Sequence, residues 1–101
     1  MFIGRVSGKI QTRRLKSGYT HNFFLVHKHR CFMTGKVVTD VVVNFGSIRT
    51  SQLATASSLL LFARIEESLD RLTNDGSILA ADALSAREKF KKFLDEMSPT
   101  H

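Results

Sequence analysis

The first half of the chain alternates apolar and polar positions with a period of two. Within residues 2–12, one parity includes Phe2, Gly4, Val6, Gly8 and Ile10, and the other includes Arg5, Ser7, Lys9 and Gln11. This period is typical of a strand with one buried and one solvated face. Two further segments, 19–32 and 36–46, are rich in β-branched and aromatic residues, and Gly46 is expected to end the second of them. Because only short polar turns separate the three segments, they predict an antiparallel meander.

The second half of the chain changes to the period of a helix. Leucine and isoleucine recur at helical spacing over residues 50–73, with charged residues on the opposite face. Thr50 or Ser51 can serve as the N-cap of this helix. A second helix is predicted over 78–97, and residues 85–88 match the capping-box pattern of a helix start.

Together these patterns predict an α+β fold, in which a three-stranded antiparallel sheet is covered on one face by two helices. A length of 101 residues with 43% hydrophobic content suits one domain with one core. We expect this single domain to cover residues 1–98 and the tail 99–101 to be frayed.

The chain has more apolar positions than one such core needs. Both parities are apolar from Phe23 to Val26, so this strand is either central in the sheet or covered by a partner chain. Apolar residues also lie off the main stripe of the first helix. We therefore expect a homo-oligomer with an interface formed by Phe23, Leu25, Leu59 and Phe62. The alternative is that the second helix covers this surplus.

Charge is divided unevenly between the two halves of the chain. Residues 1–50 contain nine Lys and Arg residues against one acid, Asp40, whereas residues 51–101 contain six against eight acids. Clustered cations attract polyanions, and each phosphate contact releases a counterion. The predicted nucleic-acid-binding residues are Arg5, Lys9, Arg13, Arg14, Lys16, Lys28, Arg30 and Lys36.

The first hypothesis for function is a small basic nucleic-acid-binding or accessory domain that neutralises phosphates, with DNA favoured over RNA. Tyr19, Phe23 and Phe32 would add base stacking if the nucleic acid were single-stranded. The second hypothesis is a non-enzymatic inhibitor or adaptor, for example an anti-defence protein, that binds an acidic or nucleic-acid-handling protein. The remaining interpretation is a basic face that only keeps the protein solvated.

Candidate chemistry for catalysis or metal binding is sparse. His27, His29 and Cys31 share a parity, which is geometrically open to a transition metal, but structural zinc needs four ligands and no second pair lies nearby. No residue is placed to orient a Cys-His pair, and no phosphate-loop motif is present. The sequence therefore predicts a non-enzymatic protein without a metal or cofactor.

The sequence carries no sign of secretion or membrane insertion. Its apolar runs are far shorter than the roughly 20 residues of a membrane span, and residues 1–8 are too short and too interrupted for a signal peptide. The single cysteine excludes an intramolecular disulfide framework. We expect a cytoplasmic protein that does not bind membranes.

Residues 23–60 carry a series of small motifs. They are Phe24-x-Val26 with Arg30, Gly35-Lys36-Val37, Val41-Val42 with Gly46 and Ile48, and Gln52-Leu53 before a leucine-bearing helix. In these motifs the segment resembles the amino-terminal β-hairpin region of DDE-type insertion-sequence transposases. The acidic triad of those enzymes belongs to a larger downstream domain, so no catalytic residue is carried over. The resemblance implies a stand-alone module of phage or mobile-element origin that is compatible with DNA binding.

Overall fold

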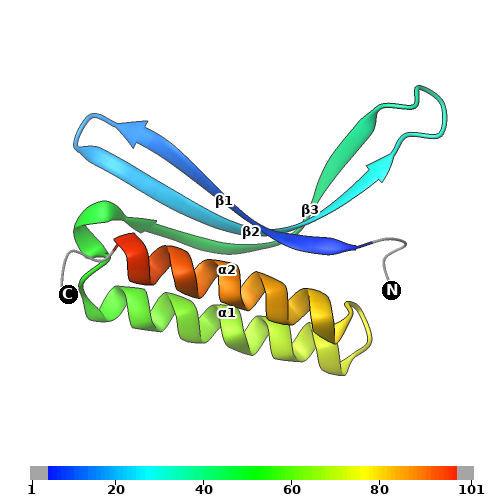
Figure 1. The fold of residues 1–101 in the computed structure, drawn as a ribbon. Coiled ribbons are helices and arrows are strands. Elements are labelled where there is room, and N and C mark those ends of the chain that lie inside the picture. The colour runs from blue at the N-terminus through cyan, green and yellow to red at the C-terminus, as the bar shows by residue number, and fades with distance from the viewer. Residues whose placement is uncertain (1–4, 98–101) are drawn as a thin grey trace.

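The computed structural model describes residues 5–97, in which three strands precede two helices (Figure 1). Strands β1 (Val6–Leu15), β2 (Gly18–Arg30) and β3 (Val37–Arg49) form one antiparallel sheet in the order β1-β2-β3. The predicted meander is confirmed. Because β2 is the central strand, it is apolar on both parities over its middle part.

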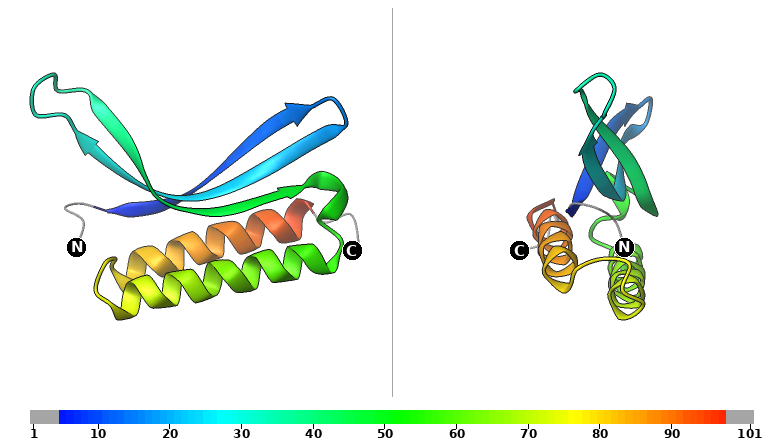
Figure 2. Two further views of the ribbon diagram at one scale, coloured as in Figure 1. Left: turned by 180° about the vertical axis from the view of Figure 1, so that it is seen from behind. Right: turned by 90° about the vertical axis from the view of Figure 1, so that its right-hand side faces the viewer.

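Two helices follow the sheet and cover one of its faces. A 3-10 turn, η1 (Thr50–Gln52), leads to α1 (Ala56–Asn74) and then to α2 (Ala80–Met97). Helix α2 packs against β1 and helix α1 packs against β3, so both lie in one layer under the sheet (Figure 2). The predicted α+β architecture is confirmed. None of the helices in the described residues is long and apolar enough to span a membrane.

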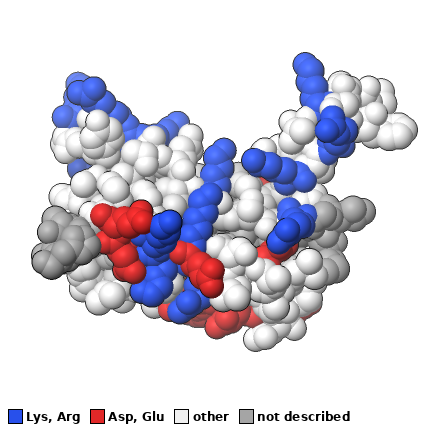
Figure 3. Space-filling model, in the orientation of Figure 1, with Lys and Arg blue, Asp and Glu red and all other residues white. Residues whose placement is uncertain are grey.

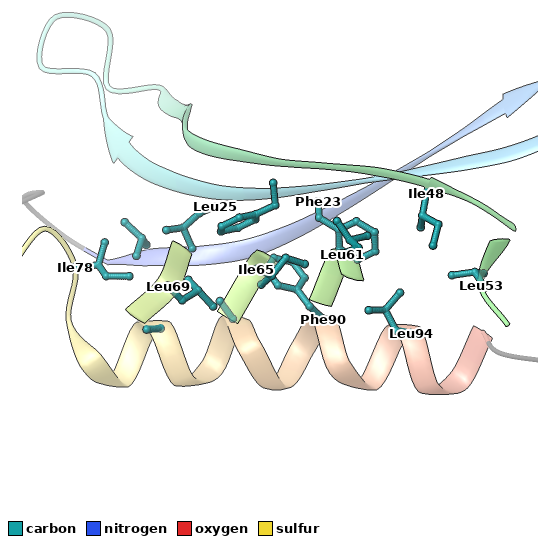
Figure 4. Close-up of a cluster of buried hydrophobic side chains, with 14 residues drawn as sticks. Phe23, Leu25, Ile48, Leu53, Leu61, Ile65, Leu69, Ile78, Phe90 and Leu94 are labelled. Atoms are coloured by element: carbon teal, nitrogen blue, oxygen red, sulfur yellow. The ribbon is translucent and has the colours of Figure 1, made fainter. Parts of the chain in front are cut away.

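One core fills the space between the sheet and the two helices (Figure 4). Phe23 and Leu25 of β2 are completely buried there, together with Ile65 of α1 and Phe90 of α2. The rings of Phe23 and Phe90 meet edge to face, with centroids 5.5 Å apart. A Cβ at Gly8 would lie 2.9 Å from the Phe90 ring. The glycine therefore allows α2 to approach β1 closely.

Strand β3 continues beyond the point where the sequence predicted its end. Gly46 has a φ of +119°, and the β2–β3 register shifts beside it, so that Phe45 becomes an extra residue that is buried in the core. This is a β-bulge, in which glycine tolerates the unusual backbone and the ladder resumes. The prediction that Gly46 ends the strand is therefore wrong, and β3 extends to Arg49.

The two predicted helix starts also need correction. The N-cap of α1 is Thr55, whose hydroxyl accepts a hydrogen bond from the Ser57 N–H at 3.2 Å, whereas Thr50 and Ser51 lie in η1. Helix α2 begins five residues before Ser85, because the alanine-rich segment ahead of the capping-box pattern is itself a strong helix former. Residues 2–4 of the predicted first strand and the predicted frayed tail 99–101 lie outside the described residues.

The ends of the sheet turn away from the helix layer. We call residues 13–20, around the β1–β2 turn, the first arm, and residues 28–39, around the β2–β3 turn, the second arm. Both arms rise on the side opposite the helices (Figures 1 and 2). A second register shift, beside Val26, lies where the second arm begins, and such irregularities bend strands. The uncovered face of the sheet is therefore concave.

Candidate functional site

Strand alternation and register divide the side chains of the sheet between two faces. Phe23 and Leu25 mark the inner face, which the helices cover. Side chains of the opposite parity on β2, with their partners on β1 and β3, lie on the concave outer face. Five exposed cations occur at these outer-face positions: Lys9, Arg13, Lys28, Arg30 and Arg49.

Two of these cations lie on either side of the same residue at the base of the first arm. Thr20 pairs with Arg13 of β1 and with Arg49 of β3. The Arg49 guanidinium donates a hydrogen bond from Nη1 to the Ser17 hydroxyl at 3.1 Å, which ties the end of β3 to the β1–β2 turn. The paired strands thus place both arginines in one row across the concave face.

The remaining outer-face cations continue towards the second arm. Lys9 is paired with Phe24, and Lys28 and Arg30 lie on the second arm itself. Arg30 donates from Nη1 to the Gly35 carbonyl at 2.7 Å, so the last residue of β2 holds the turn that follows it. Cations therefore occur along the whole length of the outer face.

Carboxylates are rare on the same surface. Asp40 pairs with His27 in the β2–β3 ladder and lies on the opposite face, where its Oδ2 is 2.7 Å from His29 Nε2. In the described residues, no ion pair joins any of the five outer-face cations to an acid. Figure 3 shows the acidic side chains mainly on the helix layer, where Lys and Arg side chains lie among them, and shows further Lys and Arg side chains on both raised arms.

The other predicted nucleic-acid-binding residues do not lie on the outer face of the strands. Arg14 faces the inner side of the first arm, and Lys16 and Lys36 lie in or beside the two turns. Arg5 is different, because its Nε donates to Asp82 Oδ1 at 3.1 Å. The other oxygen of this buried carboxylate accepts the Val6 N–H at 3.2 Å. Arg5 is therefore partly neutralised and belongs to the contact that joins α2 to β1.

A small cavity opens beside the outer face, between β1, β2 and α2. It has a volume of about 260 Å³, and its lining includes Lys9, Lys28, Lys89, Ser7 and Ser85. Lys89 reaches across from α2 and donates from Nζ to the Gly8 carbonyl at 3.0 Å. Three ammonium groups from three elements thus surround one cavity whose lining contains no carboxylate.

Sequence reasoning missed Arg49 and Lys89. Arg49 was placed outside the third strand because Gly46 was taken as its end, although the parity of β3 beyond the bulge assigns it to the outer face. Lys89 lies on a helix, and its spacing alone does not reveal that α2 packs against β1. In the sequence, Gly8 is the signal that a neighbouring element could approach β1 closely.

The predicted His27, His29 and Cys31 alignment does not form a ligand cluster. The His27 and His29 rings stack with centroids 5.4 Å apart, and His29 contacts Asp40. Within residues 5–97, no group of three or more His, Cys, Asp or Glu residues is arranged to hold a metal ion. Hydrogen bonds from Thr34, through its side chain and backbone, lower the pKa of the Cys31 thiol.

The predicted oligomer interface is wrong at two of its four positions. Phe23 and Leu25 are fully buried beneath the helices of their own chain, so they are not available to a second copy or to a nucleic acid base. Phe62 is half-buried against the core, with the Arg87 guanidinium over its ring at 5.5 Å. Leu59 is exposed on α1 beside a depression that it shares with Leu53. Homo-oligomerisation stays a prediction.

Comparison with known proteins adds no relative to these observations. No family model, no curated protein and no solved structure matches the chain. The transposase resemblance of residues 23–60 therefore stays a prediction, and the case for function depends on the site itself.

Proposed function

We propose that this protein binds nucleic acid, duplex DNA in preference to RNA, on the concave outer face of its sheet. The observation that carries the proposal is the set of five exposed cations on that face, none of which is in an ion pair with a carboxylate of the described chain. Such a surface attracts the phosphate backbone, and counterion release supplies much of the binding free energy.

The spacing of the cations supports a duplex as the ligand. Thr20, between Arg13 and Arg49, is eight positions from Lys28 on β2, which corresponds to roughly 26 Å of strand. Including Arg30, the row approaches one helical turn of DNA, about 34 Å. A concave face with a raised arm at each end suits a rod-shaped ligand, and two-stranded arms are among the elements that proteins place in a DNA groove.

Uncharged polar side chains lie between the cations on the same face. Gln11, Asn22 and Ser47 are direct partners across the three strands, and Asn44 lies one outer-face position away on β3. Amide and hydroxyl groups bond to phosphate oxygens, and Asn and Gln also match the major-groove edge of adenine. These residues would therefore position the ligand between the phosphate contacts.

The cavity lined by Lys9, Lys28 and Lys89 would hold one phosphate of the backbone. Its two serine hydroxyls can donate to phosphate oxygens. Because Lys89 already donates to the Gly8 carbonyl, its ammonium is held in place before a ligand arrives. The proposed role of all these residues is binding, and no catalytic role is proposed for any of them.

A salt titration of duplex binding tests the proposal. If each of the five outer-face cations contacts a phosphate, together they contribute about −4.5 to the slope of log K against log salt, since each contact contributes about −0.9. The Arg13→Gln/Arg49→Gln variant should bind more weakly, with a slope that is less steep by about 1.8. The matched control is Lys91→Gln/Lys92→Gln, which removes the same charge from exposed positions of α2. Equal losses in both variants would contradict a sheet-centred site.

An acidic protein partner is the competing function, since the same cations would attract it. Such a partner would be indicated if the wild-type protein failed to bind duplex or single-stranded DNA or RNA at low salt. The transposase resemblance supports the DNA-binding proposal and a mobile-element origin, because its motifs run through β2 and β3, which provide part of the outer face.

A further inference from the structure

The turn at the end of the second arm is internally fixed. The Cys31 N–H donates to the Lys36 carbonyl at 2.7 Å, and the Gly35 N–H donates to the Cys31 carbonyl at 2.8 Å. Gly35 has a φ of +71°, which suits glycine in a tight turn. With the Arg30 bond to the Gly35 carbonyl, these contacts hold the apex in a defined conformation.

Two large apolar side chains project from this apex. Phe32 is 99% exposed and Met33 is 86% exposed, and neither belongs to the core cluster. The β2–β3 turn that carries them lies well away from the helix layer, where the arm continues past the covered part of the sheet (Figure 1). The fold gains no burial from them, so the apex presents apolar surface for a reason other than packing in this chain.

Cations stand directly behind the apolar apex. Lys28 and Arg30 lie on the outer face of the arm and Lys36 lies at the end of the turn. Figure 3 shows an uncharged end on this arm with Lys and Arg side chains next to it. The combination of an apolar point with cations behind it matches proteins that insert a hydrophobic wedge into DNA while holding its phosphates.

We infer that Phe32 and Met33 form a wedge that enters between two base pairs of the duplex and kinks it. This inference rests on the proposed DNA-binding function. The cations behind the apex would hold the backbone on either side of the opened step. Flexible pyrimidine–purine steps should be favoured, because they unstack most easily.

A membrane would be the other surface suited to an apolar point with cations. A bilayer is flat, however, and the cations behind the wedge continue onto a concave face rather than around a flat rim. A rod-shaped polyanion can contact the apex and the remaining outer-face cations at the same time, whereas a flat bilayer cannot. The observations therefore favour DNA.

Two duplexes of about 20 base pairs, roughly two helical turns, test the wedge. One carries a central TA step with 2-aminopurine beside it, and the other carries a stiff central A-tract with the same label. Fluorophores at both ends report bending by energy transfer. The wild-type protein should raise 2-aminopurine fluorescence and bring the ends of the TA duplex together. It should prefer the TA duplex over the A-tract by about tenfold.

The test variant is Phe32→Ser/Met33→Ser, and the matched control is Leu60→Ser/Leu84→Ser, which removes one exposed apolar side chain from each helix. Both variants should have the same midpoint of urea unfolding as the wild-type protein. The wedge variant should keep the salt slope but lose the fluorescence increase, the bending and the TA preference, whereas the control should behave as wild type.

Failure of the wedge and failure of the proposed function give different results. Salt-dependent binding without unstacking or bending, or equal bending by the wedge variant, would overturn the wedge alone. Absence of binding to either duplex at low salt would overturn both. Binding of the wild-type protein to vesicles containing phosphatidylserine, lost in the wedge variant while DNA binding is unchanged, would also overturn the wedge.

Discussion

Alternate residues of the central strand belong to two different environments. Phe23 and Leu25 are fully buried beneath the helices, while Asn22 and Lys28 belong to the concave face that no described element covers. Three strands thus provide both the core and the proposed binding surface. Because the inner face carries the apolar burial and the outer face carries the unpaired charge, stability and binding should respond to different substitutions.

The largest effect on stability is expected in the core, where α2 packs against the inner face of the sheet. Phe90→Ala removes a completely buried ring that packs edge to face against Phe23 and Phe45. We expect the free energy of unfolding to fall by about 4 kcal/mol, from lost burial and the cavity left behind. Urea unfolding followed by circular dichroism measures this. A loss of about 1 kcal/mol or less would show that this ring does not anchor the core.

The buried carboxylate that joins α2 to β1 should have the next largest effect. Asp82→Ala leaves the Val6 N–H without its acceptor and releases Arg5. We expect a loss of about 2 kcal/mol in the free energy of unfolding, because a charged acceptor of a buried donor is removed. Asp95→Ala, at an exposed position of the same helix, should change it by no more than about 0.5 kcal/mol. Equal effects of the two substitutions would contradict the assigned contact.

A buried histidine should make stability depend on pH. His21 lies between the hydroxyls of Thr12 and Thr50, at 2.9 and 2.8 Å, and burial lowers its pKa from the ordinary value of 6.5. The imidazole of His21 is therefore protonated near pH 6.5 in the unfolded chain, but only at a lower pH in the folded chain. Stability is fully present above that pH and is lost as the pH falls towards the lowered pKa, by at most about 1.4 kcal/mol per pH unit.

The His21→Gln variant tests this assignment. Because glutamine does not titrate, the difference in unfolding free energy between about pH 7 and pH 5 should be smaller than in the wild-type protein. The comparison uses that difference rather than the absolute stability, which the substitution also changes. An unchanged pH dependence would assign the effect to other groups.

The smallest effect on stability is expected on the outer face. Arg13→Gln/Arg49→Gln removes two exposed guanidinium groups that are not in ion pairs within the described residues. The free energy of unfolding should therefore change by no more than about 0.5 kcal/mol. The same variant should lose affinity for duplex DNA. A loss of stability as large as that of Phe90→Ala would contradict the separation of stability and binding between the two faces.

The sequence was sufficient to predict the strands, the helices and the alternation between the two faces of the sheet. It was not sufficient to predict every residue of the candidate site. A period of two identified the strands, and the helical period identified both helices, because these patterns depend only on local spacing. The bulge at Gly46 depends on how β3 pairs with β2, so Arg49 was not recognised as an outer-face residue. Lys89 was missed because its contact with Gly8 depends on how α2 packs against β1.

Aromatic residues show the same limit. Phe23 and Phe32 belong to one predicted strand, and composition alone gave both of them the same possible role in stacking. The strand ends at Arg30, so Phe32 lies in a turn beyond the helix layer, whereas Phe23 lies over Phe90. Only the tertiary arrangement separates a core ring from an exposed one.

The location of the binding surface is the central claim, and amide NMR of the isotope-labelled chain tests it most directly. The side-chain amides of Gln11, Asn22 and Asn44 report on the outer face. On addition of a short duplex at low salt, their signals and the backbone signals of the outer-face cations should shift, while those of exposed α1 residues stay in place. Shifts confined to the helices, or no shifts at all, would contradict the account.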